Sequence, residues 1–490
     1  GVTGVQTCAL PISDTGTDGF DEAWEFDDVW TIKELTSGYI SYPYFSSMSY
    51  DVPEANPAVN PIPGLEEIKY SGGDGSSSYP YKIANAANLI DLSNTPADWD
   101  KHFEQTDNIV FDSDEQNVDW NGDETVNWNA EDQKGFSPIG NSATNFTGVY
   151  NGKGKVIDGL YINREFTDYI GFFGWTGNGT VQNVGLTNVE ITGRDFVGGL
   201  VGNNSTGDIT LSYVTGDVNG VDYVGGLTGS NQSGTISTSY VTVNVDGVRD
   251  VGGLVAGVSA GTISRSYAAS NVSGTGSGVG GLIGISLNDP EIMNSFWDTE
   301  ISGQDQSAGG TGKTTADLKA LATFADADWD FVGETTNGSD DIWTIEQDNR
   351  ISYPYLLAFD YDEPGTEPAV NPIPGLSAPL YAGGMGTPEA PFQIQTWEHL
   401  HNVRNNLDAH FVLNNNLDET TDGYATFVKD GETLANDGKG WEPIGNSDAE
   451  FIGKFNGGSH AIKAMEINRP TQDEIGLFGV IGTSGEVLRL

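Results

Sequence analysis

The sequence predicts an all-β fold, a right-handed parallel β-solenoid with rungs of about 27 residues, because the same features return at that spacing. A glycine-led phrase repeats along the middle of the chain, with its first glycine at Gly171, Gly198, Gly225, Gly252 and Gly280. A column of isoleucine and a column of tyrosine keep the same step, at Ile209, Ile236, Ile263, Tyr213, Tyr240 and Tyr267. A single rung cannot bury its own apolar face, so stacked rungs must share one core. The general rule for parallel crossovers makes the coil right-handed.

Each rung is predicted to contain three short strands, as at residues 196–201, 208–214 and 217–221. The turns between strands are expected at residues 203–207 and near Gly216 and Gly220, since glycine and asparagine tolerate positive φ angles. The isoleucine and tyrosine columns are both expected to point into the shared core.

The stretch between these two columns departs from strict alternation. From Ile209, alternation would turn Leu211 inward, yet the same column holds Thr238 and Arg265 in the next rungs. A buried and unpaired arginine is costly. We therefore expect a bulge or bend between the isoleucine and tyrosine columns.

A longer repeat encloses the ladder and indicates tandem modules. Residues 57–65 return unchanged as residues 368–376, and residues 138–142 match residues 443–447. The proline-rich stretches have fixed φ angles and few donors for a sheet, so they are predicted to be semi-rigid spacers. The predicted parts are the tail of a preceding module with its spacer at 13–65, a complete solenoid module at 66–345, a spacer at 346–376 and the truncated start of a second module at 377–490. Within the complete module, the glycine ladder is expected at about 146–300 and a closing segment at 301–345.

Residues 1–12 are excluded from the fold prediction. Residues 2–12 resemble the translation of a common sequencing-library adapter, so residues 1–12 are predicted to be a scar of cloning or assembly. This segment holds Cys8, the single cysteine of the sequence. Without Cys8, neither a disulfide framework nor a thiolate metal site can form.

The composition favours a secreted protein and excludes several classes of partner. The chain of 490 residues carries 70 acidic and 21 basic residues, which gives a formal net charge of −49. This charge would repel nucleic acid and anionic lipid, and it favours cations or a saline medium. No stretch of about 18 residues is apolar enough to span a membrane. We therefore expect no nucleic-acid partner and no membrane insertion in this fragment.

The repeated phrase resembles the GLUG motif, which is named for its glycine and leucine pattern. The resemblance rests on Gly-Gly-Leu-Val-Gly, then Gly-Thr-Ile, then Ser-Tyr, and it covers residues 146–330, with the start of a second copy at 451–490. Proteins with this motif include bacterial surface adhesins of the filamentous-haemagglutinin-like type and the flanks of some IgA-cleaving metallopeptidases. The resemblance implies a secreted, repetitive β-solenoid that serves as a stalk or adhesive surface on a bacterial cell.

Residues 309–314 resemble a phosphate-binding loop, but we do not predict such a loop there. Such a loop needs a glycine five positions before its Gly-Lys pair, where this chain has Ser307. A turn and a short helix are expected instead, with Thr314 and Asp317 forming a capping box.

Two hydrolase patterns are also weighed. Residues 257–261 resemble a nucleophile elbow, but Ser259 occupies the same turn between strands as Ser205 and Ser233. A zinc peptidase needs two histidines at positions i and i+4 with a glutamate between them. None of the histidines of this chain stands in that pattern: His102, His399, His401, His410 and His460. We predict no catalytic and no cofactor-binding residues.

Calcium is the one ion that the sequence suggests, at two places. The first is a loop in which oxygen ligands recur at alternate positions, Asp119, Asn121, Asp123 and Asn127, although Glu124 and Ala130 depart from the usual pattern. The second is a ladder of one carboxylate per rung, predicted at Asp168, Asp195, Asp222 and Asp250. Like charges on strands about 4.8 Å apart repel. These side chains therefore either spread into solvent beside Arg194 and Arg249 or are bridged by a cation.

An aromatic column, Tyr169, Phe196 and Tyr223, lies beside this ladder. It could stack against carbohydrate rings. It could also pack at the edge of the core, which is the commoner role of aromatic columns.

Three functional hypotheses follow. The first is a non-enzymatic extracellular protein that acts as a cell-surface adhesin or stalk and binds glycans or other cell-surface components. The second is a polysaccharide-active β-helix enzyme, a lyase or hydrolase, which would need a local cluster of acidic and basic residues that breaks the rung pattern. The third is a purely structural spacer without a ligand.

Overall fold

The computed structural model describes residues 69–111, 134–333, 338, 340–347, 350–362, 370–377 and 379–490, and the backbone of four short strands nearer the N-terminus. These strands are β1 (Trp30–Thr31), β2 (Tyr39–Ile40), β3 (Tyr44–Phe45) and β4 (Glu66–Glu67). The prediction of a parallel β-solenoid is confirmed. Val197 pairs with Val224, and Val224 pairs with Val251, so the register advances by about 27 residues per coil.

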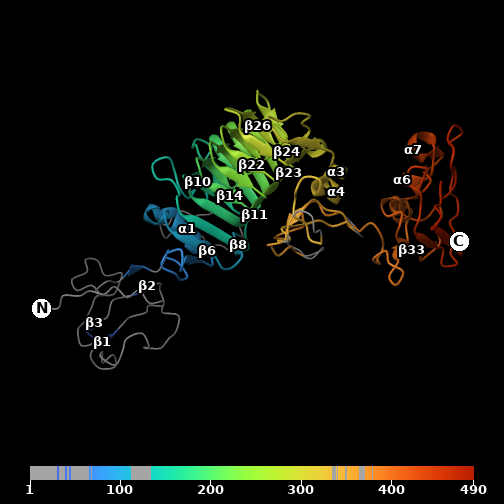
Figure 1. Cartoon of the computed structure of the whole chain (residues 1–490), viewed down its shortest axis with the longest axis horizontal. Helices are drawn as coiled ribbons and strands as arrows, with labels where there is room; N and C mark the ends of the chain where they lie inside the picture. The colour runs from blue at the N-terminus through green and yellow to red at the C-terminus, as the bar shows by residue number, and fades with distance from the viewer. Residues whose placement is uncertain are drawn as a thin grey trace.

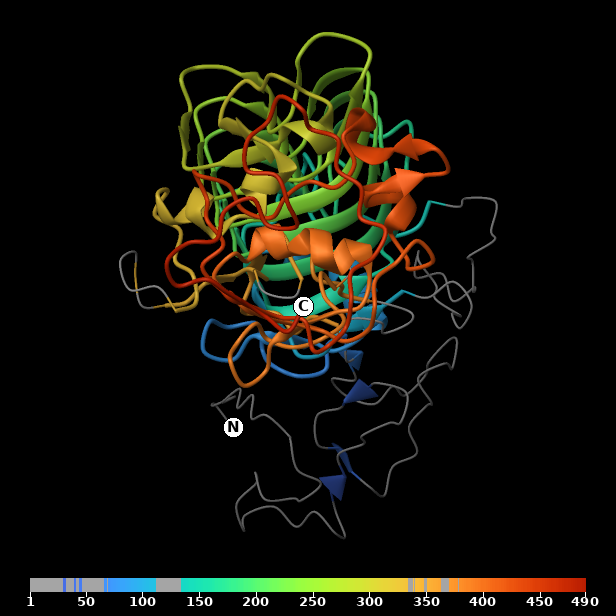
Figure 2. The same ribbon diagram turned by 90° about the vertical axis from the view of Figure 1, so that its right-hand side faces the viewer.

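Three parallel sheets form the walls of the solenoid in the described part of the chain. A five-stranded sheet contains β10 (Phe173–Thr176), β13 (Val201–Asn204), β17 (Thr228–Asn231), β21 (Val255–Val258) and β26 (Ile283–Ser286). A four-stranded sheet contains β12 (Asp195–Gly198), β16 (Asp222–Gly225), β20 (Arg249–Gly252) and β25 (Val279–Gly280). The coils follow one another in chain order along the stack (Figure 1), and the rotated view shows the same order (Figure 2).

The third sheet is the largest and has 16 strands. Its strands before the tyrosine rungs are β5 (Tyr81–Ile83), β6 (His102–Gln105), β7 (Ile109–Val110), β8 (Val149–Asp158), β9 (Tyr161–Asn163) and β11 (Thr180–Thr192). The next are β14 (Asp208–Thr210), β15 (Tyr213–Asn219), β18 (Thr235–Ser237), β19 (Tyr240–Gly247) and β22 (Thr262–Ser264). The last are β23 (Tyr267–Ala268), β24 (Asn271–Gly274), β27 (Glu291–Met293), β28 (Phe296–Asp298) and β29 (Thr311–Lys313).

A full coil contains four strands, as β12 to β15 show, where three were predicted. The strand predicted at 196–201 is divided at Gly199, where the chain turns from one sheet into the next. The strand predicted at 208–214 is divided at Leu211, and the one predicted at 217–221 is the end of β15. Glycine and left-handed backbone allow these sharp corners.

The turn predicted at 203–207 begins only at Ser205, because Asn203 and Asn204 are fully buried in β13. Inside the coil, Asn204 Nδ2 donates to Asn231 Oδ1 at 2.9 Å and to Gly207 O at 3.0 Å. The side chain of Asn204 thus connects neighbouring coils. The residue is not in the turn for which a positive φ angle was expected.

The expected bend between the isoleucine and tyrosine columns is confirmed. Leu211, Thr238 and Arg265 have φ angles of 50°, 50° and 45°. Asn183 and Asn294 hold the same conformation in the coils before and after. Arg265 is consequently exposed, so no charge is buried at this corner.

The leucines of the glycine-led phrase form a continuous core. Leu200, Leu227 and Leu254 are each 0% exposed. Leu200 N donates to Leu227 O at 3.0 Å, and Leu227 N donates to Leu254 O at 2.8 Å. Burying each such side chain is worth about 1.5–3 kcal/mol, so every added coil contributes to the stability of the stack.

Helices lie at both ends of the stack. At the N-terminal end lies α1 (Ala86–Asn94) (Figure 1). Its Leu89 and Leu92 are buried in the solenoid core. At the other end, β28 and β29 are followed by α3 (Thr315–Leu318) and α4 (Leu321–Ala325), and α2 (Thr299–Ser302) lies between these strands in the chain. No helix in the described ranges has the length and apolar character of a membrane span.

The prediction that the tyrosine column joins the interior core is wrong. Tyr213, Tyr240 and Tyr267 are buried, but they belong to a second core on the outer face of the large sheet. The left-handed residue at the preceding corner reverses the alternation, so that Ser212 points inward and Tyr213 points outward. We call the three tyrosines the tyrosine ladder.

A later segment of the chain covers this ladder. We call residues 329–377, as far as they are described, the cover. It contains the antiparallel strands β30 (Trp343–Thr344) and β31 (Tyr355–Leu356). The Trp343 ring centroid lies 6.2 Å from that of Tyr240 and 6.3 Å from that of Tyr267.

The cover also accepts hydrogen bonds from the ladder. Tyr213 donates its hydroxyl to Asn371 Oδ1 at 2.5 Å, and Tyr267 donates to Pro354 O at 2.7 Å. Part of the segment predicted as a spacer at 346–376 thus packs against the solenoid, a role that the prediction did not include. Its aromatic residues make this packing favourable.

The C-terminal part has its own core and repeats the start of the first module. Its sheet contains β32 (Phe392–Ile394), β33 (His410–Leu413), β36 (Lys454–Asn456) and β37 (Glu486–Leu488), which pair in parallel. Its other elements are α5 (Trp397–Asn402), α6 (Tyr424–Phe427), β34 (Lys429–Asp430), β35 (Thr433–Leu434) and α7 (Ala435–Gly438). Phe392, Phe411 and Phe455 pair across this sheet as Tyr81, Phe103 and Tyr150 pair across β5, β6 and β8. The module boundaries themselves stay a prediction.

Candidate functional site

The coils turn into the four-stranded sheet through residues with left-handed backbone, and three of these residues are aromatic. Tyr169, Phe196 and Tyr223 have φ angles of 60°, 58° and 57°. This conformation costs a bulky residue roughly 1–2 kcal/mol. Asp250 and Gly278 hold the same corner in later coils. The backbone therefore does not require aromatic residues at this corner.

The rings stack along the outside of the solenoid. Ring centroids are 5.0 Å apart for Tyr169 and Phe196 and 4.7 Å apart for Phe196 and Tyr223, with an interplanar angle of 14° in both pairs. Trp175, which no sequence pattern singled out, packs against the end of the stack, with its ring centroid 4.6 Å from that of Tyr169 and its plane tilted by 52°. All four side chains are partly exposed. We call these four residues the aromatic stripe.

Carboxylates and arginines lie beside the stripe. Arg194 Nε and Nη2 donate to the two carboxylate oxygens of Asp168 at 2.6 and 2.5 Å, and Arg194 Nε lies 3.5 Å from Asp195 Oδ2. Arg249 forms a similar two-point pair with Asp222, with its Nε 3.0 Å from Asp222 Oδ1. Burial, followed by the charges of Asp168 and Asp222, raises the pKa of Asp195. The arginines offset the repulsion along this row.

The predicted ladder of four aspartates is wrong at its fourth member. Asp195 pairs with Asp222, but Asp222 pairs with Arg249, so Asp250 lies one position later, in the column of Tyr223. The buried valines that follow set the register of this coil, so Asp250 is opposite Tyr223 and not opposite Asp222.

Calcium sites were predicted on this ladder and in a loop. Among the residues that the structure describes, no group of three or more His, Cys, Asp or Glu side chains is placed to hold a metal ion. The predicted loop ligands lie outside the described residues: Asp119, Asn121, Asp123 and Asn127.

Exposed apolar side chains border the charged row. Phe166 is 82% exposed, Val221 42% and Val248 41%. Val221 N donates to Arg194 O at 2.7 Å, and Val248 N donates to Val221 O at 2.7 Å, which places these residues on successive coils. The surface thus combines stacked rings, charged pairs and an apolar edge.

The two motifs set aside as mimics have structural roles. The predicted capping box is confirmed: Thr314 is the N-cap of α3, and Asp317 N donates to Thr314 Oγ1 at 3.1 Å. Ser259 lies between β21 and β22, and its N donates to Asn231 O at 3.0 Å. A strand and not a helix follows Ser259, so it lacks the setting of a nucleophile elbow.

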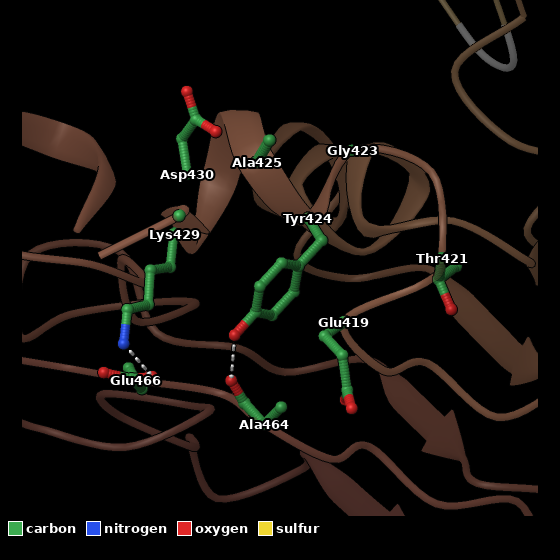
Figure 3. Close-up of a pocket in the computed structure, with 10 residues that line it drawn as sticks. Glu419, Thr421, Gly423, Tyr424, Ala425, Lys429, Asp430, Ala464 and Glu466 are labelled. Atoms are coloured by element: carbon green, nitrogen blue, oxygen red, sulfur yellow. Dashed lines mark hydrogen bonds and ion pairs between the residues drawn. The ribbon is translucent and has the colours of Figure 1, made fainter. Parts of the chain in front are cut away.

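A hollow of about 610 Å³ lies in the C-terminal part, beside α6 and β34 (Figure 3). Tyr424 donates its hydroxyl to Ala464 O at 2.9 Å across this hollow. Lys429 Nζ lies 3.0 Å from Glu466 Oε1, and this contact raises the pKa of Lys429. The lining residues come from 419–431 and 464–466, so no local sequence pattern could predict the hollow.

A second hollow, of about 350 Å³, lies on the outer face of the large sheet. Polar side chains from three neighbouring strands line it: Tyr161, Asn163, Glu190, Thr192, Asp217 and Asn219. Asn244 of the next coil donates to Asp217 Oδ1 at 2.8 Å. This face is therefore polar beyond the part that the cover occupies.

No family model matches the chain. The chain is 42% identical over 113 residues to the "Putative Gly-rich membrane protein" of Evansella cellulosilytica, and the match covers 23% of this chain and 12% of that protein. It is 32% identical over 144 residues to Halomucin of Haloquadratum walsbyi, which covers 29% of this chain and 2% of that protein. The matched parts are thus a small share of these relatives.

A solved structure is also similar to the chain. It is described as a "putative immunoglobulin A1 protease" from Bacteroides ovatus and is 18% identical to this chain. The alignment covers 60% of this chain and 96% of that chain, with a TM-score of 0.40.

Proposed function

We propose that the chain is part of a non-enzymatic extracellular repeat protein that acts as a cell-surface adhesin or stalk, with the aromatic stripe as its glycan-binding surface. The observation that carries the proposal is the partly exposed stack of Tyr169, Phe196 and Tyr223 beside paired aspartates and arginines. The parallel rings cover one another's faces, so a glycan would contact the exposed edges of the rings, and the charged groups beside them would fix its orientation. A linear glycan along the stripe would meet a new ring at each coil.

The surface location is supported by the relatives' names, a Gly-rich membrane protein and Halomucin. The resemblance of the repeat to the GLUG motif supports the same location. Both observations concern the class of protein, and the identity of the glycan has to be determined by experiment.

The alternative of a polysaccharide-active enzyme fits the stripe less well. A carboxyl group that acts as a general acid or base must exchange protons with its substrate. Asp168 and Asp222 are instead each held by two contacts from an arginine, Arg194 and Arg249. These pairs suit the orientation of a ligand better than acid–base chemistry.

A glycan array probed with the full chain, with calcium and with chelator, tests the proposal. Phe196→Ala removes the central ring, and we expect it to weaken glycan binding about 3- to 10-fold, since a ring contact is worth about 0.5–1.5 kcal/mol. Tyr79→Ala is the matched control, because Tyr79 is an exposed aromatic residue outside the stripe.

Equal affinity of the Phe196→Ala chain and the unchanged chain would contradict the role of the stripe. Turnover of a polysaccharide during the assay would favour an enzyme. The absence of any glycan binding would favour a structural spacer.

A further inference from the structure

The smaller hollow on the outer face of the large sheet is built from three neighbouring strands. We call it the polar hollow; it measures about 350 Å³ and is lined by Tyr161, Asn163, Glu190, Thr192, Asp217 and Asn219. Glu190 pairs with Tyr161 on one neighbouring strand and with Asp217 on the other. Thr192 pairs in the same way with Asn163 and Asn219. The lining therefore consists of two columns that run from coil to coil.

Both columns point away from the solenoid core. On each of the three strands, the residue between the columns is fully buried in that core: Ile162, Ile191 and Val218. Successive side chains of a strand point to opposite faces, so the lining residues must point outward. Glu190 is exposed, and the other five lining residues are partly buried. These side chains thus form the floor and walls of a shallow site that is open to solvent.

The lining of the polar hollow is rich in hydrogen-bond acceptors and has no cation. It contains two carboxylates, two side-chain amides, a hydroxyl and a phenol, and no lysine or arginine. Glu190 and Asp217 form no salt bridge with any residue that the structure describes. An ionised carboxylate only accepts hydrogen bonds. A complementary ligand therefore offers many donors and carries no negative charge.

The next coils hold part of this surface in place and continue it. Asn244 Nδ2 donates to Asp217 Oδ1 at 2.8 Å, which fixes the carboxylate before any ligand arrives. Such preorganisation lowers the entropic cost of binding. The columns continue beyond the hollow, because Asn244 pairs with Asp217 and Asp246 pairs with Asn219. A long ligand that crosses the strands would meet similar polar groups at each coil, about every 4.8 Å.

We propose that the polar hollow binds a neutral polysaccharide, which lies across the strands and runs along the coils. The hydroxyls of a neutral sugar donate to Glu190 and Asp217, and hydrogen bonds to a charged acceptor are the stronger kind. An anionic polysaccharide is repelled by these two carboxylates and by the net charge of −49. The site lies on a different sheet from the aromatic stripe, so this proposal does not depend on glycan binding at the stripe.

Four full-length chains test this proposal. They are the unchanged chain, Glu190→Ala/Asn219→Ala in the hollow, Phe196→Ala in the stripe, and the matched control Asp208→Ala/Asn178→Ala. The control also removes one carboxylate and one amide, from exposed positions outside the hollow. Affinity electrophoresis measures binding in gels that contain mixed-linkage β-glucan, glucomannan, dextran or the anionic polygalacturonate. Circular dichroism confirms that each chain is folded.

Labelling of carboxyl groups shows where the polysaccharide binds. Carbodiimide and glycine ethyl ester modify accessible carboxylates, and peptide mass spectrometry compares Asp217 in the hollow with Asp195 beside the stripe. Both are measured with and without the polysaccharide that retards the chain most.

We expect at least one of the neutral polysaccharides, and not polygalacturonate, to retard the unchanged chain. Glu190→Ala/Asn219→Ala should weaken this binding at least about 10-fold, because it removes a charged and a neutral hydrogen-bond partner, while the matched control should bind like the unchanged chain. Labelling of Asp217 should slow when the polysaccharide is bound. The Phe196→Ala chain should keep this protection of Asp217, which separates the hollow from the stripe.

Three results would overturn the proposal. The first is that no neutral polysaccharide retards the chain, or that polygalacturonate retards it equally. The second is equal affinity of Glu190→Ala/Asn219→Ala and the matched control. The third is protection of Asp195 without protection of Asp217, which would assign the binding to the stripe alone.

Discussion

The Ser-Tyr pair of each coil shows how neighbouring residues take opposite roles. Ser212, Ser239 and Ser266 are each 0% exposed, whereas the tyrosine that follows each serine faces the cover. Ser212 N donates to Ser239 Oγ at 3.3 Å, and Ser239 N donates to Ser266 Oγ at 3.2 Å. Each serine hydroxyl also donates to the carbonyl two residues earlier. These bonds satisfy buried backbone groups where the left-handed corner interrupts the sheet.

Substitution of the central serine tests this role. Ser239→Ala leaves Ser212 N buried without its acceptor, so we expect the free energy of unfolding in urea to fall by about 1–3 kcal/mol. Ser233→Ala is the control, because Ser233 is exposed and bonds to the preceding coil through its backbone, where Ser233 N donates to Ser205 O. Similar losses in both variants would show that the inward hydroxyl has no special role.

The tyrosine ladder and its cover form a structural element of their own. The ring centroids of Tyr213 and Tyr240 are 4.9 Å apart, and those of Tyr240 and Tyr267 are 5.1 Å apart, with the rings within 4° of parallel. Burial is the first cause that raises the pKa of each of these tyrosines well above its ordinary value. The ladder therefore stays neutral while the cover is in place.

This burial predicts a loss of stability at alkaline pH. In the unfolded chain a tyrosine loses its proton near pH 10, whereas in the folded chain the ladder keeps its protons. The unfolded state then binds fewer protons, so the free energy of unfolding decreases as pH rises above about 10, by up to about 1.4 kcal/mol per pH unit for each tyrosine. Urea unfolding at about pH 8 and at steps up to about pH 11 measures this slope.

Tyr267→Phe provides the comparison for the alkaline prediction. Phenylalanine keeps the ring but has no proton to lose, so the variant should lose less stability per pH unit above pH 10 than the unchanged chain. It also lacks the hydrogen bond to Pro354 O, which lowers its stability at every pH. Parallel pH profiles for the two chains would refute the link to the ladder.

The whole molecule is stabilised by stacking and opposed by its own charge. Each coil rests on its neighbours through leucine, valine and isoleucine, and contacts of this kind add along the stack. A net charge of −49 opposes compaction, because like charges repel over the whole surface. Exposed pairs such as Arg194 with Asp168 offset only part of this repulsion.

Salt is therefore expected to stabilise the chain. Raising sodium chloride from about 0.01 M to about 1 M shortens the Debye length from about 30 Å to about 3 Å and screens the net repulsion. We expect the thermal unfolding temperature to rise across this series, as measured by circular dichroism. A falling temperature would mean that the attractive surface pairs outweigh the repulsion.

The sequence by itself determined the fold class, the length of the coil and the bend before the tyrosine column. These features follow from periodicity, because residues one coil apart occupy equivalent positions and Leu200, Leu227 and Leu254 must share one core. The capping box of Thr314 and Asp317 was equally predictable, since it depends on contacts three residues apart. The sequence also located the aromatic column of Tyr169, Phe196 and Tyr223. It did not predict that these rings are partly exposed or that Trp175 contacts Tyr169.

Only the tertiary structure decided which way the tyrosines point and what covers them. One left-handed residue reverses the alternation at the corner, and its effect on Tyr213 does not show in the residue types. The cover lies more than one hundred residues away from Tyr213 in the sequence, as the bond from Tyr213 to Asn371 spans 158 positions. A local sequence pattern holds no information about a partner so far away in the chain. Only the folded structure therefore shows that the outer face of the large sheet carries a second core.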